Sequence, residues 1–369
     1  MPSEDLQVTA APLRVEPFLH IEADSLYNPL TDRRIESADA DYAVLRALSA
    51  GERPIAALAF EHSRRLAEQG WLVPDTGRLA ERFRLKYVAL EAHTVCNQAC
   101  YFCPVSIAPR EDYFMPTDLY ERIAAQLAAY RNTIEAVFMI NYNEPTVDHR
   151  FLDQVRTLKY HRLPPAVLTN GSGLTPQRVN ALAEMGGLRF LSVNLSTLDR
   201  ERYASERGVD QLDLVLRNVD YVARRQVAEQ MDLVVLGKGD DVHRRDFEEI
   251  QARYAGSCFT VKFFEVMDRA GYLPVGLHPV APHKNLRGCE NIGSRPLQHL
   301  HITPRGTCVL CCEDYSEHHE VGDLNVQTVA EVLASPAFAS LRNQAYGLEE
   351  APADFICRKC VFARTAPSV

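Results

Sequence analysis

The chain has 369 residues, of which 46% are hydrophobic and 24% charged, and a formal net charge of −9 at pH 7. This is the balance of a globular protein, and the negative charge argues against nucleic acid or an acidic membrane as a general partner. No apolar run reaches the roughly 18 residues that a membrane-spanning helix needs. The N-terminal segment lacks the apolar stretch of a secretory signal, so we expect a cytoplasmic protein.

Residues 1–85 form a separate unit in the sequence pattern. Apolar residues alternate over residues 13–30, which predicts short strands. Two helical patterns follow over residues 38–51 and 52–73, and glycines at positions 51 and 70 are placed as helix C-termini require. We therefore predict a small winged-helix-like domain over 1–85.

The pattern of residues 86–270 changes to strand, loop and helix, repeated. Thr117 and Thr175 are candidate N-caps of two of the helices. Strands that alternate with helices predict a parallel sheet, and six units are too few for a closed eightfold barrel. The fold class is thus α/β, a partial (β/α)6 TIM-like barrel, with predicted strands at residues 87–94, 136–144, 165–171, 189–197, 230–237 and 259–266.

Ten cysteines are unusual in a chain without an export signal. The cytosol keeps thiols reduced, so clustered cysteines there indicate metal binding or catalysis. Three of them, with the spacing C-x3-C-x2-C, follow the first barrel strand, where parallel α/β folds place their sites. Three thiolates without a fourth nearby cysteine make a poor structural zinc site. They suit a [4Fe–4S] cluster with one open iron, held by Cys96, Cys100 and Cys103.

The residues CNQACYFC, which include the aromatic Phe102, resemble the signature of the radical S-adenosylmethionine (SAM) superfamily. The resemblance implies that SAM chelates the open iron. It further implies cleavage of SAM to methionine and a 5′-deoxyadenosyl radical, which abstracts hydrogen from the substrate. It also implies a reductant such as flavodoxin or ferredoxin as a partner.

The same resemblance places SAM contacts at the strand ends. Asn143 and Glu144 stand where the family has a glycine-glycine-glutamate loop, and Glu144 is the expected ligand of the SAM amine. Ser196, after the fourth strand, is expected to meet the ribose or the carboxylate.

Three further SAM contacts are expected, and each has a simpler alternative. Thr169 and Asn170 match a common T-N-G ending beside the ribose, but they also suit a turn before a glycine. Arg207 matches an arginine that grips the SAM carboxylate, for which a guanidinium fork is suited. Its alternative is a solvated helix charge.

The cysteines of residues 271–369 resemble a SPASM-type extension, an iron–sulfur domain found in part of this superfamily. The resemblance implies one auxiliary [4Fe–4S] cluster, and a structural zinc ion is the alternative. The expected ligands are Cys289, Cys311, Cys357 and Cys360, with Cys308 or Cys312 as a substitute for Cys311.

Enzymes of the SPASM type mostly modify peptides, and some modify carbohydrates or aminocyclitols. Residues 1–85 weakly resemble a RiPP recognition element, which captures a precursor peptide along a sheet edge; the alternative is a cap that shields the barrel. Our first hypothesis is an enzyme that crosslinks, epimerises or oxidises a ribosomally made precursor peptide. The alternatives are a dehydrogenase, epimerase or lyase acting on a small molecule, such as a sugar, nucleotide sugar or aminocyclitol, and a non-enzymatic iron–sulfur or zinc protein.

Cys258 stands apart from both cysteine groups, just before the sixth strand. A thiol there could return a hydrogen atom to a substrate radical, as epimerisation needs. The alternative is a small buried hydrophobe, which is the commoner role of an isolated cysteine.

Overall fold

The computed structural model describes residues 11–279 and 281–365, and a nine-stranded sheet forms its centre. Six neighbouring strands are parallel and follow chain order, which confirms the expected partial barrel. They are β6 (Tyr87–Leu90), β7 (Ala136–Phe138), β8 (Pro165–Thr169), β9 (Leu188–Asn194), β10 (Ala228–Gly237) and β11 (Thr260–Glu265).

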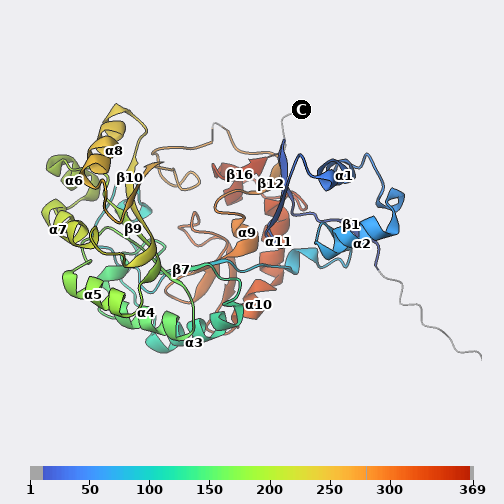
Figure 1. Cartoon of the computed structure of the whole chain (residues 1–369). Coiled ribbons are helices and arrows are strands. Elements are labelled where there is room, and N and C mark those ends of the chain that lie inside the picture. The colour runs from blue at the N-terminus through green and yellow to red at the C-terminus, as the bar shows by residue number, and fades with distance from the viewer. Residues whose placement is uncertain (1–10, 280, 366–369) are drawn as a thin grey trace, which may run out of the picture.

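Helices cover the outer face of the barrel (Figure 1). Val137, Val167 and Leu191 point toward them and are fully buried in the main core. Within the described part of the chain, no helix is both long and apolar enough to cross a membrane. The covering helices are α3 (Thr117–Leu127), α4 (Phe151–Tyr160), α5 (Pro176–Glu184), α6 (Arg200–Arg207), α7 (Leu212–Val222) and α8 (Asp241–Arg253).

The two expected helix caps have different outcomes. Thr175 caps α5, since its side chain accepts a hydrogen bond from the backbone N–H of Arg178. The prediction for Thr117 was wrong. The N-cap of α3 is Pro116, whose backbone is extended, and Thr117 is the first helical residue. Its hydroxyl accepts a hydrogen bond from Arg150 at 3.3 Å.

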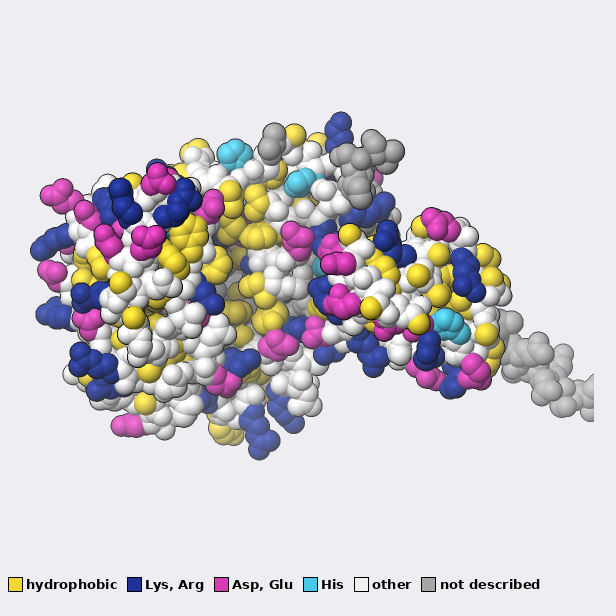
Figure 2. All heavy atoms as spheres, turned by 45° about the horizontal axis from the view of Figure 1, so that its top comes forward, with side chains coloured by type: hydrophobic (Ala, Val, Ile, Leu, Met, Phe, Trp, Pro, Cys, Tyr) yellow, Lys and Arg dark blue, Asp and Glu magenta, His cyan; other side chains and the backbone are white. Residues whose placement is uncertain are grey.

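The inner face of the barrel strands lines a lumen. Larger side chains on this face are only partly buried, whereas their neighbours toward the helices are fully buried, and the alternation of a strand separates the two sets. Figure 2 shows a hollow between the barrel and the rest of the protein, with hydrophobic side chains gathered along it. The partly buried inner positions include Phe138, Leu168, Phe190 and Val234.

The C-terminal part of the chain continues the barrel sheet. Strand β13 (His299–Ile302) pairs in parallel with β6, and β14 (Thr307–Val309) and β15 (Glu320–Asp323) add antiparallel strands beyond it. Three helices and a strand pair complete this part: α9 (Arg295–Gln298), α10 (Val329–Leu333), α11 (Pro336–Ala345), and β12 (Leu286–Cys289) with β16 (Ala363–Thr365).

The N-terminal unit combines two small sheets with two helices and lies against the C-terminal part (Figure 1). Gly51 and Gly70 have the positive φ angles expected after the helices, 72° and 83°. The second helical pattern begins later than expected, because a 3-10 turn at Ile55–Ala57 precedes the helix. The elements are β1 (Leu13–Val15), paired with β5 (Leu72–Pro74), the three-stranded sheet β2 (His20–Ile21), β3 (Ser25–Asn28) and β4 (Arg33–Glu36), and helices α1 (Ala40–Ser49) and α2 (Phe60–Glu68).

Buried polar contacts fix the N-terminal unit to the C-terminal part. His20 is 4% exposed, and its Nε2 lies 2.9 Å from the hydroxyl of Tyr346. Gln298 donates to the Tyr27 hydroxyl at 2.8 Å. Tyr27 and His20 face each other across β2 and β3. The unit is therefore held through its β2–β3 side.

The contact made by His20 predicts a loss of stability in acid. Burial, with smaller effects of Arg364 and Arg34, lowers the pKa of His20 from 6.5 to about 3. Below pH 6.5 the unfolded chain therefore binds a proton that the folded chain excludes. The free energy of unfolding should fall by about 1.4 kcal/mol per pH unit from this residue, down to the folded pKa.

Urea denaturation at several pH values gives the free energy of unfolding, and its slope against pH gives the number of protons taken up on unfolding. We expect His20→Gln to lower this number by about one between pH 6.5 and pH 5. The control is His149→Gln, because the His149 side chain is 88% exposed. Equal pH dependences for His20→Gln and the unaltered protein would contradict the prediction.

Candidate active site

The first cysteine loop is tied by its backbone to the end of strand β7 and to the end of helix α6. The N–H of Glu144, after β7, donates to the carbonyl of Val95 at 3.0 Å. The N–H of Ala99 donates to the carbonyl of Arg207 at 2.9 Å, at the end of α6. The loop thus lies at the carboxyl edge of the sheet, where the sequence predicted a site.

The surroundings of the three cysteines are largely apolar. Cys100 is 9% exposed and packs with Phe102 and Val266, while Cys96 and Cys103 are partly buried. Burial raises the pKa of the Cys96 thiol to about 12 and also raises that of Cys103. Metal binding requires the thiolate form, so it must release protons here.

The cysteines do not form a site for one metal ion. Over residues 11–279 and 281–365, no group of three or more His, Cys, Asp and Glu side chains is arranged to hold a single ion. Four zinc ligands would all lie about 2.0–2.3 Å from one centre. A four-iron cluster instead offers each thiolate its own iron, and three cysteines of one loop fit that requirement.

Glu144 crosslinks the ends of β7 and β8. It is 2% exposed, and its Oε1 accepts from the hydroxyls of Thr146 and Thr169, both at 2.6 Å. The N–H of Thr146 also donates to Oε1, and the N–H of Asn170 donates to Oε2 at 2.7 Å. Burial raises the pKa of this carboxyl, and the Thr146 hydroxyl is the largest opposing influence. A carboxylate has about four acceptor positions, two on each oxygen. Three donors share Oε1, whereas Oε2 accepts only from Asn170 and keeps one position free for another donor.

The other residues expected around SAM are also joined by hydrogen bonds. The side chain of Asn170 donates to Asn97, between the first two cysteines, at 2.8 Å. The amide of Asn143 lies 3.3 Å from the ring nitrogen of His93. The Thr169 hydroxyl accepts from the N–H of Gly171, as its turn-forming alternative predicted. Thr169 and Asn170 therefore form the turn and also contact the other site residues.

Arg207 is buried rather than solvated, at 2% exposure. One of its terminal nitrogens, Nη2, donates to Ser196 at 2.7 Å and to Asn194 at 2.9 Å. Its guanidinium lies 4.9 Å from the centre of the Phe102 ring. The structure thus brings three of the expected cofactor-binding residues together beside Cys100.

Cys258 lies away from this group. It precedes β11, and its N–H donates to the carbonyl of Ala223, just after α7. Because the strands are parallel, this is the amino edge of the sheet, opposite the cysteine loop. Its side chain packs against the main core. The position favours the packing alternative.

The second cysteine set surrounds a cavity. Arg295 and Glu313 lie in the same wall, and apolar side chains supply much of the rest. The four cysteines in this wall are the four expected ligands, Cys289, Cys311, Cys357 and Cys360. The donor set suits a cluster ligated by four thiolates.

The two remaining cysteines of this region do not line the cavity. Cys308 is fully buried in the main core on β14. The Cys312 sulfur accepts a hydrogen bond from Arg295. The structure therefore favours Cys311 over both alternatives.

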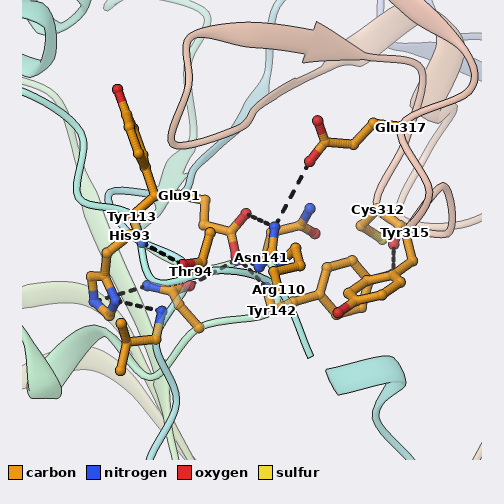
Figure 3. A network of polar contacts seen from close by, with 12 residues as sticks. Glu91, His93, Thr94, Arg110, Tyr113, Asn141, Tyr142, Cys312, Tyr315 and Glu317 are labelled. Carbon is orange, nitrogen blue, oxygen red and sulfur yellow. Dashed lines mark hydrogen bonds and ion pairs between the residues drawn. The ribbon is translucent and has the colours of Figure 1, made fainter. Parts of the chain in front are cut away.

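A polar network runs from the end of β6 to Cys312 in the C-terminal part (Figure 3). Glu91, directly after β6, is fully buried and accepts from Arg110 at 2.5 and 3.0 Å. Glu91 also accepts from the N–H of Tyr142 at 2.9 Å. The hydroxyl of Tyr142 donates to the carbonyl of Cys312, and its ring packs edge-on against Tyr315.

Sequence reasoning missed Arg110 and Arg295, because no motif marks them. Arg110 lies seven residues after the last loop cysteine, and Arg295 lies six residues after Cys289. Burial of an arginine next to cysteines is a property of the tertiary fold. The only signal in the sequence was their proximity to the cysteines.

Two family models match the chain. The model described as the Radical SAM superfamily matches residues 90–250, and the SPASM model, described as an iron-sulfur cluster-binding domain, matches residues 289–361. Each matched segment contains one of the two cysteine sets.

Curated relatives match only parts of the chain. A "Tungsten-containing aldehyde ferredoxin oxidoreductase cofactor-modifying protein" of Pyrococcus furiosus is 31% identical, over 28% of this chain and 28% of its own length. A "GTP 3',8-cyclase" of Ectopseudomonas mendocina is 30% identical, over 45% of this chain and 51% of its own length. The chain thus spans about half or less of the length of these relatives.

A solved structure resembles nearly the whole fold. Streptococcus suis SuiB, bound to its precursor peptide SuiA, aligns with a TM-score of 0.56 at 13% identity, over 90% of each chain. The unmatched tenth of this chain is shorter than its N-terminal unit. The likeness in fold therefore extends into that unit.

The four hydrogen bonds that the Glu144 carboxylate accepts predict the effect of Glu144→Gln. The amide would present an N–H₂ group to at least one protein donor, which costs about 1–3 kcal/mol of stability. The network that positions the neighbouring site residues would be weakened, so we expect at least a tenfold loss of SAM affinity. Thermal denaturation and equilibrium binding of SAM measure the two effects.

The matched control is Glu184→Gln, at an exposed position at the end of α5. It should change stability by less than about 0.5 kcal/mol. An unchanged SAM affinity in Glu144→Gln would show that this carboxylate neither binds SAM nor orients the residues that do.

Proposed function

We propose that this chain, which belongs to the radical SAM superfamily and to its SPASM subgroup, modifies a ribosomally synthesised precursor peptide. Membership implies a [4Fe–4S] cluster with SAM, and an auxiliary iron–sulfur centre in the SPASM domain. The finer assignment of the substrate rests on the N-terminal unit.

The residues present suit these groups. We assign Cys96, Cys100 and Cys103 to the first cluster, with Asn143, Glu144, Thr169, Asn170, Ser196 and Arg207 around SAM. We assign the four cysteines of the C-terminal cavity to the auxiliary cluster. Together with SAM, the first cluster supplies a 5′-deoxyadenosyl radical that takes a hydrogen atom from the substrate.

The chain's own part in this chemistry is to position the substrate and to exclude water. The half-buried inner positions of the barrel offer an apolar surface below the cysteine loop. Apolar packing around Cys100 keeps water from the reacting groups. An electron donor of the flavodoxin or ferredoxin class completes the system.

The observation that carries the peptide proposal is the open edge of β4. Within the described residues β4 pairs with β3 alone, and three of its four residues are exposed. An extended peptide can add to such an edge as a further strand. The fold likeness to SuiB, whose structure holds a precursor peptide, extends into this unit and supports the proposal.

A nucleotide or another small molecule is the second candidate substrate. The relative named as a GTP 3',8-cyclase favours it, since it matches 45% of this chain at 30% identity. In that case the N-terminal unit would serve only as a support. The two candidates differ in whether β4 contacts the substrate.

Replacing Cys96, Cys100 and Cys103 together with alanine should abolish the cleavage of SAM. The reconstituted, reduced protein should form 5′-deoxyadenosine and methionine, which liquid chromatography measures, and the triple variant should form neither. Cys258→Ala is the matched control and should keep the activity, because its side chain lies at the opposite edge of the sheet. Absence of 5′-deoxyadenosine from the unaltered protein would overturn the enzymatic assignment.

The peptide proposal predicts protection of β4 from hydrogen exchange. The probe is a synthetic peptide with the sequence of a short open reading frame, which has first to be sought beside the gene, and it is added to the reconstituted full chain. Those amides of Arg33–Glu36 that point away from β3 should exchange at least tenfold more slowly with the peptide, because the new strand would accept their hydrogen bonds.

The control region is β15, an edge strand of the large sheet, whose exchange should not change. The opposite result is unprotected β4 together with 5′-deoxyadenosine formation stimulated by GTP. That outcome would replace the peptide by the small-molecule candidate.

A further inference from the structure

Arg207 contacts the first cysteine loop through its backbone as well as its side chain. The carbonyls of Glu206 and Arg207 accept from the N–H groups of Tyr101 and Ala99, at 3.1 and 2.9 Å. These two residues flank Cys100 on either side. Gly208, in the left-handed region with φ of 69°, ends α6 directly against the loop.

The guanidinium of Arg207 reaches the sulfur of Cys100. Its Nη1 lies 3.6 Å from Sγ, within hydrogen-bond distance for sulfur. The rings of Phe102 and Tyr203 lie 4.9 and 5.7 Å from the guanidinium and shield it from water. In such a dry environment a charged donor affects a thiolate much more strongly than it would in water.

The remaining contacts of the side chain limit its use for a carboxylate. A carboxylate is gripped through two N–H groups on one edge of the guanidinium, and both such edges include Nη2. Ser196 and Asn194 already use the two Nη2 protons. The Nε has no partner among the described residues, but it shares an edge only with Nη2. Neither edge is thus free for the two-pronged grip on SAM that the sequence suggested.

We infer that Arg207 is a positioning residue that donates to the Cys100 thiolate and raises the reduction potential of the first cluster. Reduction adds negative charge to the cluster, and a cation with a hydrogen bond to its sulfur stabilises that charge. The inference is independent of the substrate, since it concerns the protein before SAM or substrate binds.

The test is a redox titration of the reconstituted full chain without SAM, followed by electron paramagnetic resonance. The Cys96, Cys100 and Cys103 triple alanine variant identifies the signal of the auxiliary cluster, so the signal that it lacks belongs to the first cluster. In Arg207→Gln the midpoint of that first signal should move to a more negative potential. In Arg207→Lys, which keeps the charge, it should move less.

Two controls separate this effect from a general disturbance. The auxiliary signal should not move in either variant, because Arg207 contacts none of the four C-terminal cysteines. Arg200→Gln lies on the same helix, but Arg200 is exposed and pairs with the exposed Asp210 and Asp213, so this variant should leave both signals unchanged.

The outcomes decide the inference in either direction. An unchanged first potential in Arg207→Gln, with weakened SAM binding, would make Arg207 a SAM ligand alone and overturn the proposal. If Arg207→Gln folds, judged by circular dichroism, but loads no first cluster, Arg207→Lys gives the decision. A negative shift in that variant supports the proposal, and an unchanged potential overturns it.

Discussion

The pairing of β13 with β6 is the constraint on which the arrangement of both cysteine sets depends. Four residue pairs, from His299 with Tyr87 to Ile302 with Leu90, join the two strands. The first cysteine loop follows β6. Cys311 follows β14, which is separated from β6 in the sheet only by β13. Neighbouring strands lie about 4.8 Å apart, so backbone hydrogen bonds within one sheet fix the separation of the two sets. A hinge between domains would not give this precision.

The chain is acidic overall, but arginines gather around and between the cysteines. Arg207 contacts Cys100, Arg295 contacts Cys312, and Arg110 pairs with the fully buried Glu91. Burial of a charge is costly unless an opposite charge lies nearby. Thiolates and the clusters that they ligate are negative, and they supply that charge where no carboxylate does. The surface charge of this protein therefore says little about its interior.

Local features of the sequence predicted the fold well. The six barrel strands were found because helices bury their outer face, which gives each strand a short apolar run between turns. The three loop cysteines were found because their spacing is local, and Thr175 was found because Pro176 follows it. Sequence reasoning was wrong where a residue far away in the chain determines the contacts of a side chain. The hydroxyl of Thr117 accepts a hydrogen bond from Arg150 instead of capping its helix.

The limits are clearest for Arg207 and for the N-terminal unit. The motif around Arg207 predicted a carboxylate ligand. In the structure its side chain donates to Asn194 and Ser196, at the end of the strand before its own helix, and no spacing rule reports these contacts. In the same way, the pattern of residues 1–85 indicated strands and helices but not their attachment. The side chains of His20 and Tyr27 contact the C-terminal part, whereas their neighbours along each strand point to the opposite face of the sheet. The sequence pattern does not tell which of the two faces makes the contact.

This attachment has a consequence for the proposed peptide substrate. The unit is held through β2 and β3, and Lys86 in the connection to the barrel forms a further ion pair with Asp32 at 2.8 Å. Because these contacts are buried, the unit cannot swing toward the lumen without breaking them. A peptide added to β4 would therefore start from a fixed point relative to the cysteine loop. The number of residues between its bound segment and the modified residue would then be set by the protein, so the length of the peptide linker would select the modified position.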